Sequence, residues 1–132
     1  MQLSILFSVG VGGGIGALIR YFVADWVQTI ASTFGGSAFN WGIFVVNITG
    51  GFVMGLIVEA SALKLNLSPE MRAFLTTGVL GGYTTFSTFS LDSALLLQKG
   101  EYALAAFYVI GSAVCSIAAL FAGLWVVRAV YA

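Results

Sequence analysis

Four long apolar stretches constrain the fold of this chain more than any other feature of its sequence. They cover residues 3–23, 41–58, 71–97 and 102–130, and a helix needs about 20 mainly apolar residues to cross a lipid bilayer. Only 8% of the 132 residues are charged, whereas a soluble domain carries about 25%. We therefore predict an all-α membrane protein with four transmembrane helices that form a single domain, residues 1–132, in contact with lipid.

The charged and reactive side chains exclude several classes of protein. The chain has five Lys and Arg residues and five Asp and Glu residues. It therefore lacks the excess of positive charge that binding to a nucleic acid requires. Histidine is absent and Cys115 is the one cysteine, which excludes an intramolecular disulfide and the usual zinc sites. The commonest general base is therefore missing, as is the nucleotide motif G-x-x-x-x-G-K-S/T. We expect a protein that is not an enzyme.

Short polar segments connect the apolar stretches. Residues 33–37 (T-F-G-G-S) read as a loop, and residues 98–101 as a short turn. Between the second and third stretches, Ser68 is expected to cap the next helix, with Pro69 in its first turn and Glu70 favourable to its dipole. With four spans, both termini lie on one side of the membrane.

Basic residues near the ends of the spans set the orientation of a membrane protein. Lys64, Arg72 and Arg128 fall on the side of the two termini, and Arg20 and Lys99 fall on the other. Three against two gives almost no bias. Either one extra charge orients the chain, or the chain has dual topology, in which copies insert both ways and pair antiparallel.

The centre of the third stretch is a poor helix former. Residues 78–90 read G-V-L-G-G-Y-T-T-F-S-T-F-S, with two adjacent glycines followed by β-branched and hydroxyl residues. We predict that this span is broken near Gly81 to Thr84. The alternative is that the glycines only allow a close helix contact. Because lipid cannot satisfy the carbonyl groups that a break would free, these must be buried or line a cavity.

Small and polar residues form stripes along the other stretches. Asn47, Gly51 and Gly55 recur every fourth residue and share one helix face, so Asn47 either bonds to a second helix or donates to an anion. A second stripe with the same spacing consists of Tyr108, Ser112 and Ser116. Its side chains either line a pathway or bond back to their own helix. Glycines in the first stretch match the helix-packing pattern G-x-x-x-G: Gly10 with Gly14, and Gly12 with Gly16.

The polar groups at mid-depth suit an anion better than a cation. No basic residue lies there, but phenyl rings carry a positive edge, and Phe86 and Phe89 project from nearly one side of a helix. The small fluoride ion accepts strong hydrogen bonds, which amide and hydroxyl donors can supply: Asn47, Ser87, Thr88, Ser112 and Ser116. Weak serial sites of this kind allow release as well as entry. The alternative is that the phenylalanines only fill space or face lipid.

Residues 81–90, G-G-Y-T-T-F-S-T-F-S, resemble the signature G-G-x-T-T-F-S-T-F-S of the Fluc (CrcB) fluoride channels. Residues 12–20 (G-G-G-I-G-A-L-I-R) and 47–51 (N-I-T-G-G) are similar to other blocks of that family. The likeness covers essentially the whole chain. It implies a fluoride-selective channel in the cell (inner) membrane, which lets fluoride leave passively and protects the cell from its toxicity.

The resemblance also implies an assembly and a set of roles. The family forms an antiparallel, dual-topology homodimer with two pores and a structural sodium ion at its centre, held by backbone carbonyls that correspond to Gly81 and Thr84. Arg20 corresponds to an arginine near the vestibule. The pore residues implied by the family motifs are Asn47, Phe86, Phe89, Tyr108, Ser112 and Ser116. Two positions depart from the family: Leu120 replaces a frequent threonine, and Asp92 a common glutamate.

Two other functions are compatible with a small four-span protein. A small four-span, proton-coupled exporter of cationic drugs needs an acid within its first span, and residues 3–23 contain none. Asp92 is the one acid well inside a span, and intramembrane acids are usually functional, but we assign it no proton-relay role. A scaffold that transports nothing would leave the predicted break and the polar stripes without a purpose.

Overall fold

The computed structural model describes residues 2–36 and 38–131, which form helices and short connections. The predicted loop at residues 33–37 is therefore described except for Ser37, which lies outside these ranges. The helices in chain order are α1 (Gln2–Thr33), α2 (Trp41–Leu63), α3 (Pro69–Ala73), the π-helix η1 (Phe74–Leu80), α4 (Gly81–Tyr83), α5 (Phe86–Gln98) and α6 (Tyr102–Tyr131). The predicted all-α class is confirmed. Three helices, α1, α2 and α6, are long and apolar enough to cross a membrane.

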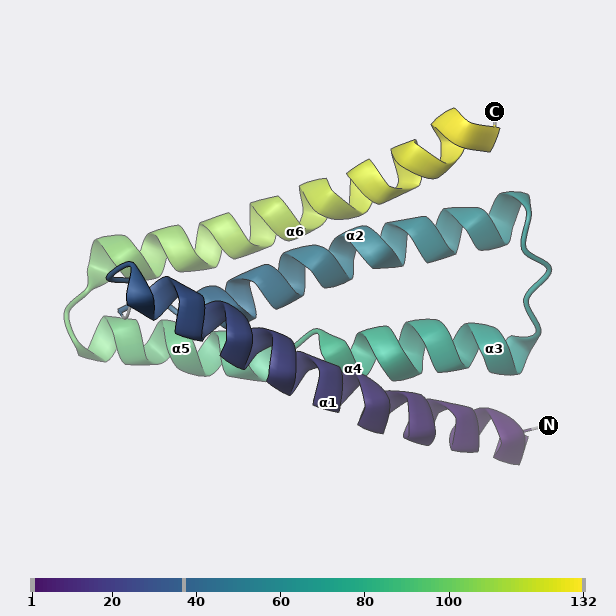
Figure 1. Cartoon of the computed structure of the whole chain (residues 1–132), viewed down its shortest axis with the longest axis horizontal. Helices are drawn as coiled ribbons and strands as arrows, with labels where there is room; N and C mark the ends of the chain where they lie inside the picture. Colours follow the sequence, from purple (N-terminus) through teal and green to yellow (C-terminus); the bar gives the residue numbers. More distant parts are fainter. Residues whose placement is uncertain (1, 37, 132) are drawn as a thin grey trace.

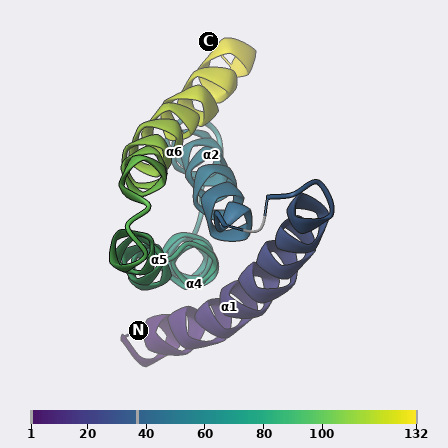
Figure 2. The ribbon, with the colours of Figure 1, turned by 90° about the vertical axis from the view of Figure 1, so that its left-hand side faces the viewer.

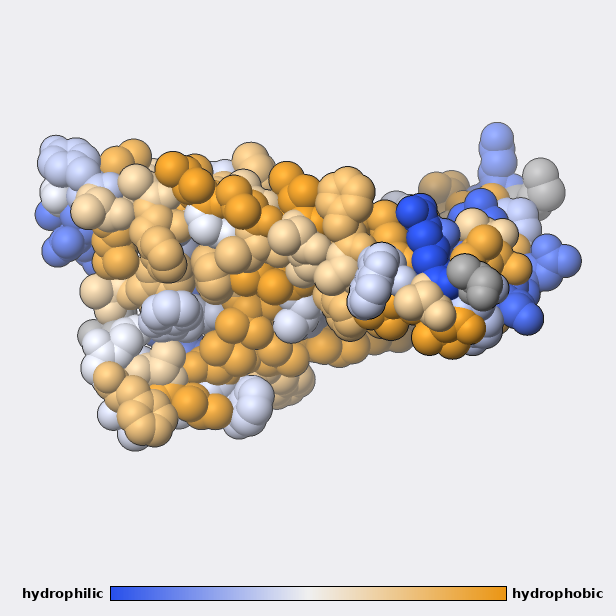
Figure 3. All heavy atoms as spheres, turned by 90° about the horizontal axis from the view of Figure 1, so that it is seen from above, coloured by the Kyte–Doolittle hydropathy of each residue, from blue (hydrophilic) through white to orange (hydrophobic). Residues whose placement is uncertain are grey.

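The helices form an elongated bundle in which the chain passes from end to end four times (Figure 1). Helices α2 and α6 lie side by side and run in the same direction, while α1 crosses the segment α3–α5 (Figures 1 and 2). Both termini and the α2–α3 connection lie at one end. In the space-filling view, hydrophilic residues gather at the two ends and apolar residues cover the middle (Figure 3). This distribution suits a bundle whose middle lies in lipid.

Glycines set how closely the helices approach one another. A Cβ added at Gly16 would overlap the Val79 carbonyl, and one at Gly12 would lie 2.6 Å from the Phe74 carbonyl oxygen. The packing role predicted for this pair is thus confirmed, and it joins α1 to η1. Gly10 and Gly14, by contrast, have no atom of another described segment within 4 Å of such a Cβ. The second G-x-x-x-G pair therefore does not pack within one chain.

The stripe that begins at Asn47 faces α6. A Cβ at Gly51 would lie 2.7 Å from the Ser116 carbonyl oxygen, and one at Gly55 would overlap the Leu120 carbonyl. Gly123 of α6 packs in the same way on α2. Because these backbones touch, the polar residues near them lie inside the bundle.

The helix ends follow the sequence in one place and depart from it in another. The predicted cap at Ser68 is confirmed, because its Oγ accepts the Met71 N–H at 3.2 Å. Helix α1, however, continues past Val23 to Thr33. Arg20 therefore lies inside this helix, as does Asp25, an exposed acid that the shorter predicted span left out.

Candidate functional site

Two residues with extended backbone, Thr84 and Thr85, separate α4 from α5. Their φ and ψ angles are −77° and 156° for Thr84, and −148° and 126° for Thr85. The Thr85 hydroxyl oxygen caps α5 by accepting the Thr88 N–H at 3.2 Å. Threonine suits this position because its β-branched side chain favours extended backbone and its hydroxyl can cap a helix.

The side chain of Asn47 bonds to the backbone of this extended segment. Asn47 Nδ2 donates to the Thr85 carbonyl at 3.1 Å, and the Thr85 N–H donates to Asn47 Oδ1 at 2.9 Å. Of the two roles left open for Asn47, a bond to a second segment is therefore present. One N–H of its amide remains after that bond, because the group carries two.

The carbonyls of Gly81 and Thr84 lose their helical donors at this point. In a continuous helix they would accept the N–H groups four residues later, which belong to Thr85 and Thr88. These two N–H groups bond instead to Asn47 and to the Thr85 hydroxyl. Arg20 Nη1 lies 3.5 Å from the Thr84 carbonyl oxygen. Arg20 is thus beside the extended segment, midway along α1, and not near a helix end as expected.

A second side-chain contact, which the sequence did not reveal, ties α2 to α4. The hydroxyl oxygens of Thr49 and Tyr83 lie 2.8 Å apart, so one donates to the other. Thr49 also bonds back to the Val45 carbonyl in its own helix. The extended segment is therefore held to α2 at two points, by Tyr83 just before it and by Thr85 within it.

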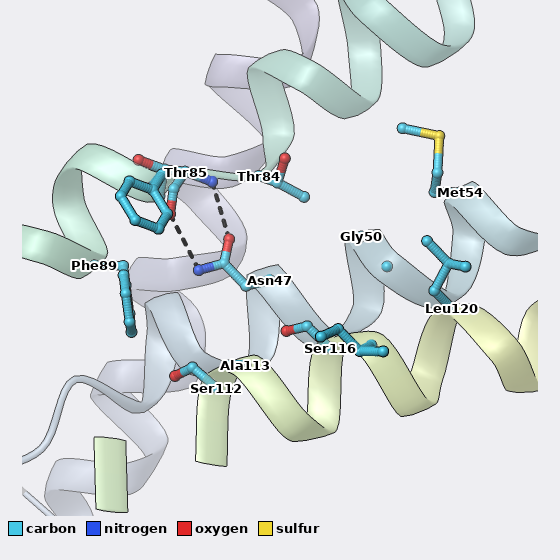
Figure 4. Close-up of a pocket in the computed structure, with 13 residues that line it drawn as sticks. Asn47, Gly50, Met54, Thr84, Thr85, Phe89, Ser112, Ala113, Ser116 and Leu120 are labelled. Atoms are coloured by element: carbon cyan, nitrogen blue, oxygen red, sulfur yellow. Dashed lines mark hydrogen bonds between the residues drawn. The ribbon is translucent and has the colours of Figure 1, made fainter. Parts of the chain in front are cut away.

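A cavity of about 420 Å³ lies between the extended segment, α2 and α6 (Figure 4). It brings together several predicted site residues: Asn47, Thr84, Phe86, Phe89, Ser112 and Ser116. Leu120, the departure on α6, also lines it. Four other predicted pore or vestibule residues do not line it: Arg20, Ser87, Thr88 and Tyr108. All the polar side chains that line this cavity are uncharged.

Two hydroxyls of the cavity wall are buried without a partner. The Oγ atoms of Ser112 and Ser116 have no hydrogen-bond partner among the described residues, so neither bonds back to its own helix. A buried polar group without a partner costs about 1–3 kcal/mol. A small acceptor in the cavity would remove this cost.

The two phenylalanines differ in exposure. Their ring centroids lie 5.5 Å apart, and Phe89 is half-buried. Phe86, at the start of α5, has 79% of its surface exposed in the single chain. One wall of the cavity is therefore an open aromatic surface.

Tyr108 lies behind Phe89 and its hydroxyl is already engaged. Its ring is fully buried and stacks on Phe89 with centroids 5.5 Å apart. The hydroxyl donates to Asp92 Oδ2 at 3.0 Å, and Asn40 Nδ2 donates to the same oxygen at 2.9 Å. The role of Asn40 could not be read from the sequence, because this residue lies 52 residues from Asp92.

A second cavity of about 250 Å³ adjoins this cluster. It is lined by Gln28, Ala38, Phe39, Asn40, Asp92, Leu95, Leu96 and Lys99.

These features define a class: a multi-pass α-helical membrane protein with a cavity that is open on one side and lined by neutral donors and aromatic rings. The family is also identified. The family described as CrcB-like protein, Camphor Resistance (CrcB), matches residues 7–124, and the chain belongs to this family.

Curated relatives match nearly the whole chain. A protein of Agrobacterium fabrum (strain C58) is 53% identical over 116 residues, which are 88% of this chain and 90% of the relative. One of Rhodopseudomonas palustris (strain BisB5) is 49% identical, over 92% of this chain and 95% of its own length. One of Rhizobium meliloti (strain 1021) is 48% identical, over 92% and 94%. All three are named fluoride-specific ion channel FluC, a name for a channel and not for an enzyme or a drug exporter.

Proposed function

We propose that this chain is a fluoride-selective channel of the bacterial inner membrane, which releases fluoride passively and so protects the cell. The main support for the proposal is the pair of buried hydroxyls at Ser112 and Ser116, which have no partner among the described residues and lie in a cavity whose lining is uncharged. The names of the relatives agree with it. Fluoride is the halide that such donors favour most, because it is the smallest and the strongest hydrogen-bond acceptor.

Neutral donors can replace the water around fluoride in steps. The second N–H of Asn47 and the hydroxyls of Ser112 and Ser116 are available, and the serines stand one helical turn apart. The positive ring edges of Phe86 and Phe89 add partial charge. Because no buried cation holds the ion, each site binds weakly enough to release it. Ser87 and Thr88, in the first turn of α5, supply further hydroxyls next to Phe86 and Phe89, and Tyr108 supports the Phe89 ring from behind.

The pore is completed by a second, antiparallel copy in a dual-topology homodimer. The exposed ring of Phe86 supports this arrangement, because an aromatic wall of the cavity then faces the partner. An antiparallel pair places two equivalent pores side by side. Cross-linking of tagged copies in intact membranes tests it: tags must be accessible from both sides, and a single orientation would contradict dual topology.

The carbonyls of Gly81 and Thr84 fit a structural sodium ion at the centre of such a dimer. Both carbonyls lack the N–H donors that a continuous helix would provide, and Gly81 is exposed. Sodium is a hard cation, and such cations prefer oxygen ligands. Bound sodium would neutralise the freed carbonyl dipoles where two copies meet. Arg20 Nη1 donates to the Thr84 carbonyl at 3.5 Å, which leaves the second lone pair of that oxygen for the ion. Exchange of sodium for N-methylglucamine should weaken the dimer, which size-exclusion chromatography can follow; an unchanged dimer contradicts the proposal.

Survival of cells in fluoride tests the proposed activity. A bacterial strain made sensitive to fluoride by loss of its own exporter should grow when it expresses this chain, and should stop growing when it expresses Asn47→Asp. The control is growth without fluoride, which both must support. If the chain restores no growth although it reaches the membrane, the proposed function is wrong.

A further inference from the structure

Two cavities lie on either side of one buried ring. Phe89 lines the first cavity and Phe39 the second, and the Tyr108 ring lies between them. It stacks on Phe89 at 5.5 Å with 30° between the rings, and meets Phe39 edge-on at 4.9 Å. Tyr108, which lines neither cavity itself, is therefore the middle ring of a three-ring partition between them.

The position of this partition depends on one carboxylate oxygen. Asp92 Oδ2 accepts both the Tyr108 hydroxyl and Asn40 Nδ2. Hydrogen bonds to a charged group are about twice as strong as those between neutral groups. Asp92 also places a negative charge close to the proposed path, because it lies on α5 one turn after Phe89. An anion that crosses the partition meets this carboxylate.

Asn40 has two separate contacts. Its Oδ1 caps α2 by accepting the Ile43 N–H at 3.1 Å. Its Nδ2 is directed to Asp92 at 2.9 Å. The capping role needs only an acceptor, which Ser and Asp supply as well as Asn. The choice of an amide at this position therefore provides a donor for Asp92 that the cap does not require.

We propose that Asn40 is a positioning residue for the ion pathway: it holds the Asp92 carboxylate against Tyr108 and shares its negative charge, so that fluoride can cross between the cavities. This inference rests on the proposed function. Without the amide donor, the charge of Asp92 is concentrated on a side chain with one remaining partner. The repulsion of a passing anion then increases.

Substitution by serine separates the two contacts of Asn40. Asn40→Ser keeps the acceptor for Ile43 but has no amide to reach Asp92. Fluoride flux through proteoliposomes should fall at least fivefold, while the variant still folds and assembles as the wild type does. Asn66→Ser, at an exposed asparagine of the α2–α3 connection, is the matched control and should leave flux unchanged. If the serine variant does not fold, Asn40→Asp replaces it; this also keeps the cap, and should reduce flux further because it adds a second carboxylate.

The same change in an Asp92→Asn background distinguishes positioning from a structural effect. The amide at position 92 still accepts the Tyr108 hydroxyl but carries no charge, so Asn40→Ser should then cause no further loss. An equal loss in both backgrounds would mean that Asn40 acts only through α2, and normal flux in Asn40→Ser would overturn the inference directly. Absence of fluoride flux in the wild type would instead refute the proposed function on which the inference rests.

Discussion

Asn47 and Thr85, which lie 38 residues apart, are joined by two hydrogen bonds. The side-chain amide of Asn47 donates to the Thr85 carbonyl and accepts the Thr85 N–H. The asparagine supplies what a helix would have supplied to the backbone at that point. The extended segment can therefore lie inside an apolar bundle without an unsatisfied N–H or C=O at Thr85, which in lipid would cost several kcal/mol. In the same position, Asn47 presents a spare donor to the cavity.

Asn47→Asp should abolish most fluoride flux. The carboxylate keeps an acceptor for the Thr85 N–H but loses the donor to the Thr85 carbonyl, and it places a negative charge in the cavity. A lost hydrogen bond and added repulsion together amount to more than about 1.4 kcal/mol, which corresponds to a tenfold change or more. Flux in proteoliposomes measures the effect. Retention of wild-type flux would show that this amide does not serve the ion.

Phe86→Ile should reduce fluoride flux while the protein still assembles. Isoleucine is apolar like phenylalanine but has no aromatic edge, and the exposure of Phe86 in the single chain means that the change leaves the packing within that chain almost intact. Phe121→Ile is the matched control, because Phe121 is 64% exposed but does not line the cavity. If Phe86→Ile conducts fluoride as well as the control Phe121→Ile, the ring edge of Phe86 has no role in conduction.

Replacement of both buried serines should separate stability from activity. Ser112→Ala with Ser116→Ala removes two hydroxyls that have no partner among the described residues, so the folded state should be equally or more stable, by up to about 3 kcal/mol for each site. Fluoride flux should nevertheless fall, because two donors are lost. Thermal unfolding in detergent and flux are measured on the same preparation. A marked loss of stability would show that the hydroxyls have structural partners.

Gly16→Val should weaken the bundle, and Gly14→Val should not. A side chain at Gly16 meets the Val79 backbone, whereas Gly14 faces open space in the single chain. Overpacking of this kind costs about 1–3 kcal/mol, and α1 would have to move away from η1. Thermal unfolding of the two variants gives the comparison. If Gly14→Val alone impairs assembly, that face of α1 lies against a second copy.

The sequence predicts the features that depend on local chemistry. The apolar stretches and the Ser68 cap follow from residue type and spacing, and the likeness to a known signature supplied the family. The rotation of a helix about its axis is different: both glycine pairs of α1 match the same pattern, and only packing decides that Gly12 and Gly16 face η1. The ties of Arg20 to Thr84 and of Asn40 to Asp92 also depend on tertiary contacts, so spacing along the chain could not reveal them.

The most direct test of the account is the selectivity of passive anion release. Liposomes that contain the purified protein are loaded with fluoride and chloride, and each ion is followed with its own electrode after dilution into a medium free of both. If neutral donors and ring edges carry the ion, fluoride should leave rapidly while chloride stays inside. Fluoride held as tightly as in empty liposomes, or equal release of both ions, would show that neutral donors and ring edges do not conduct fluoride selectively.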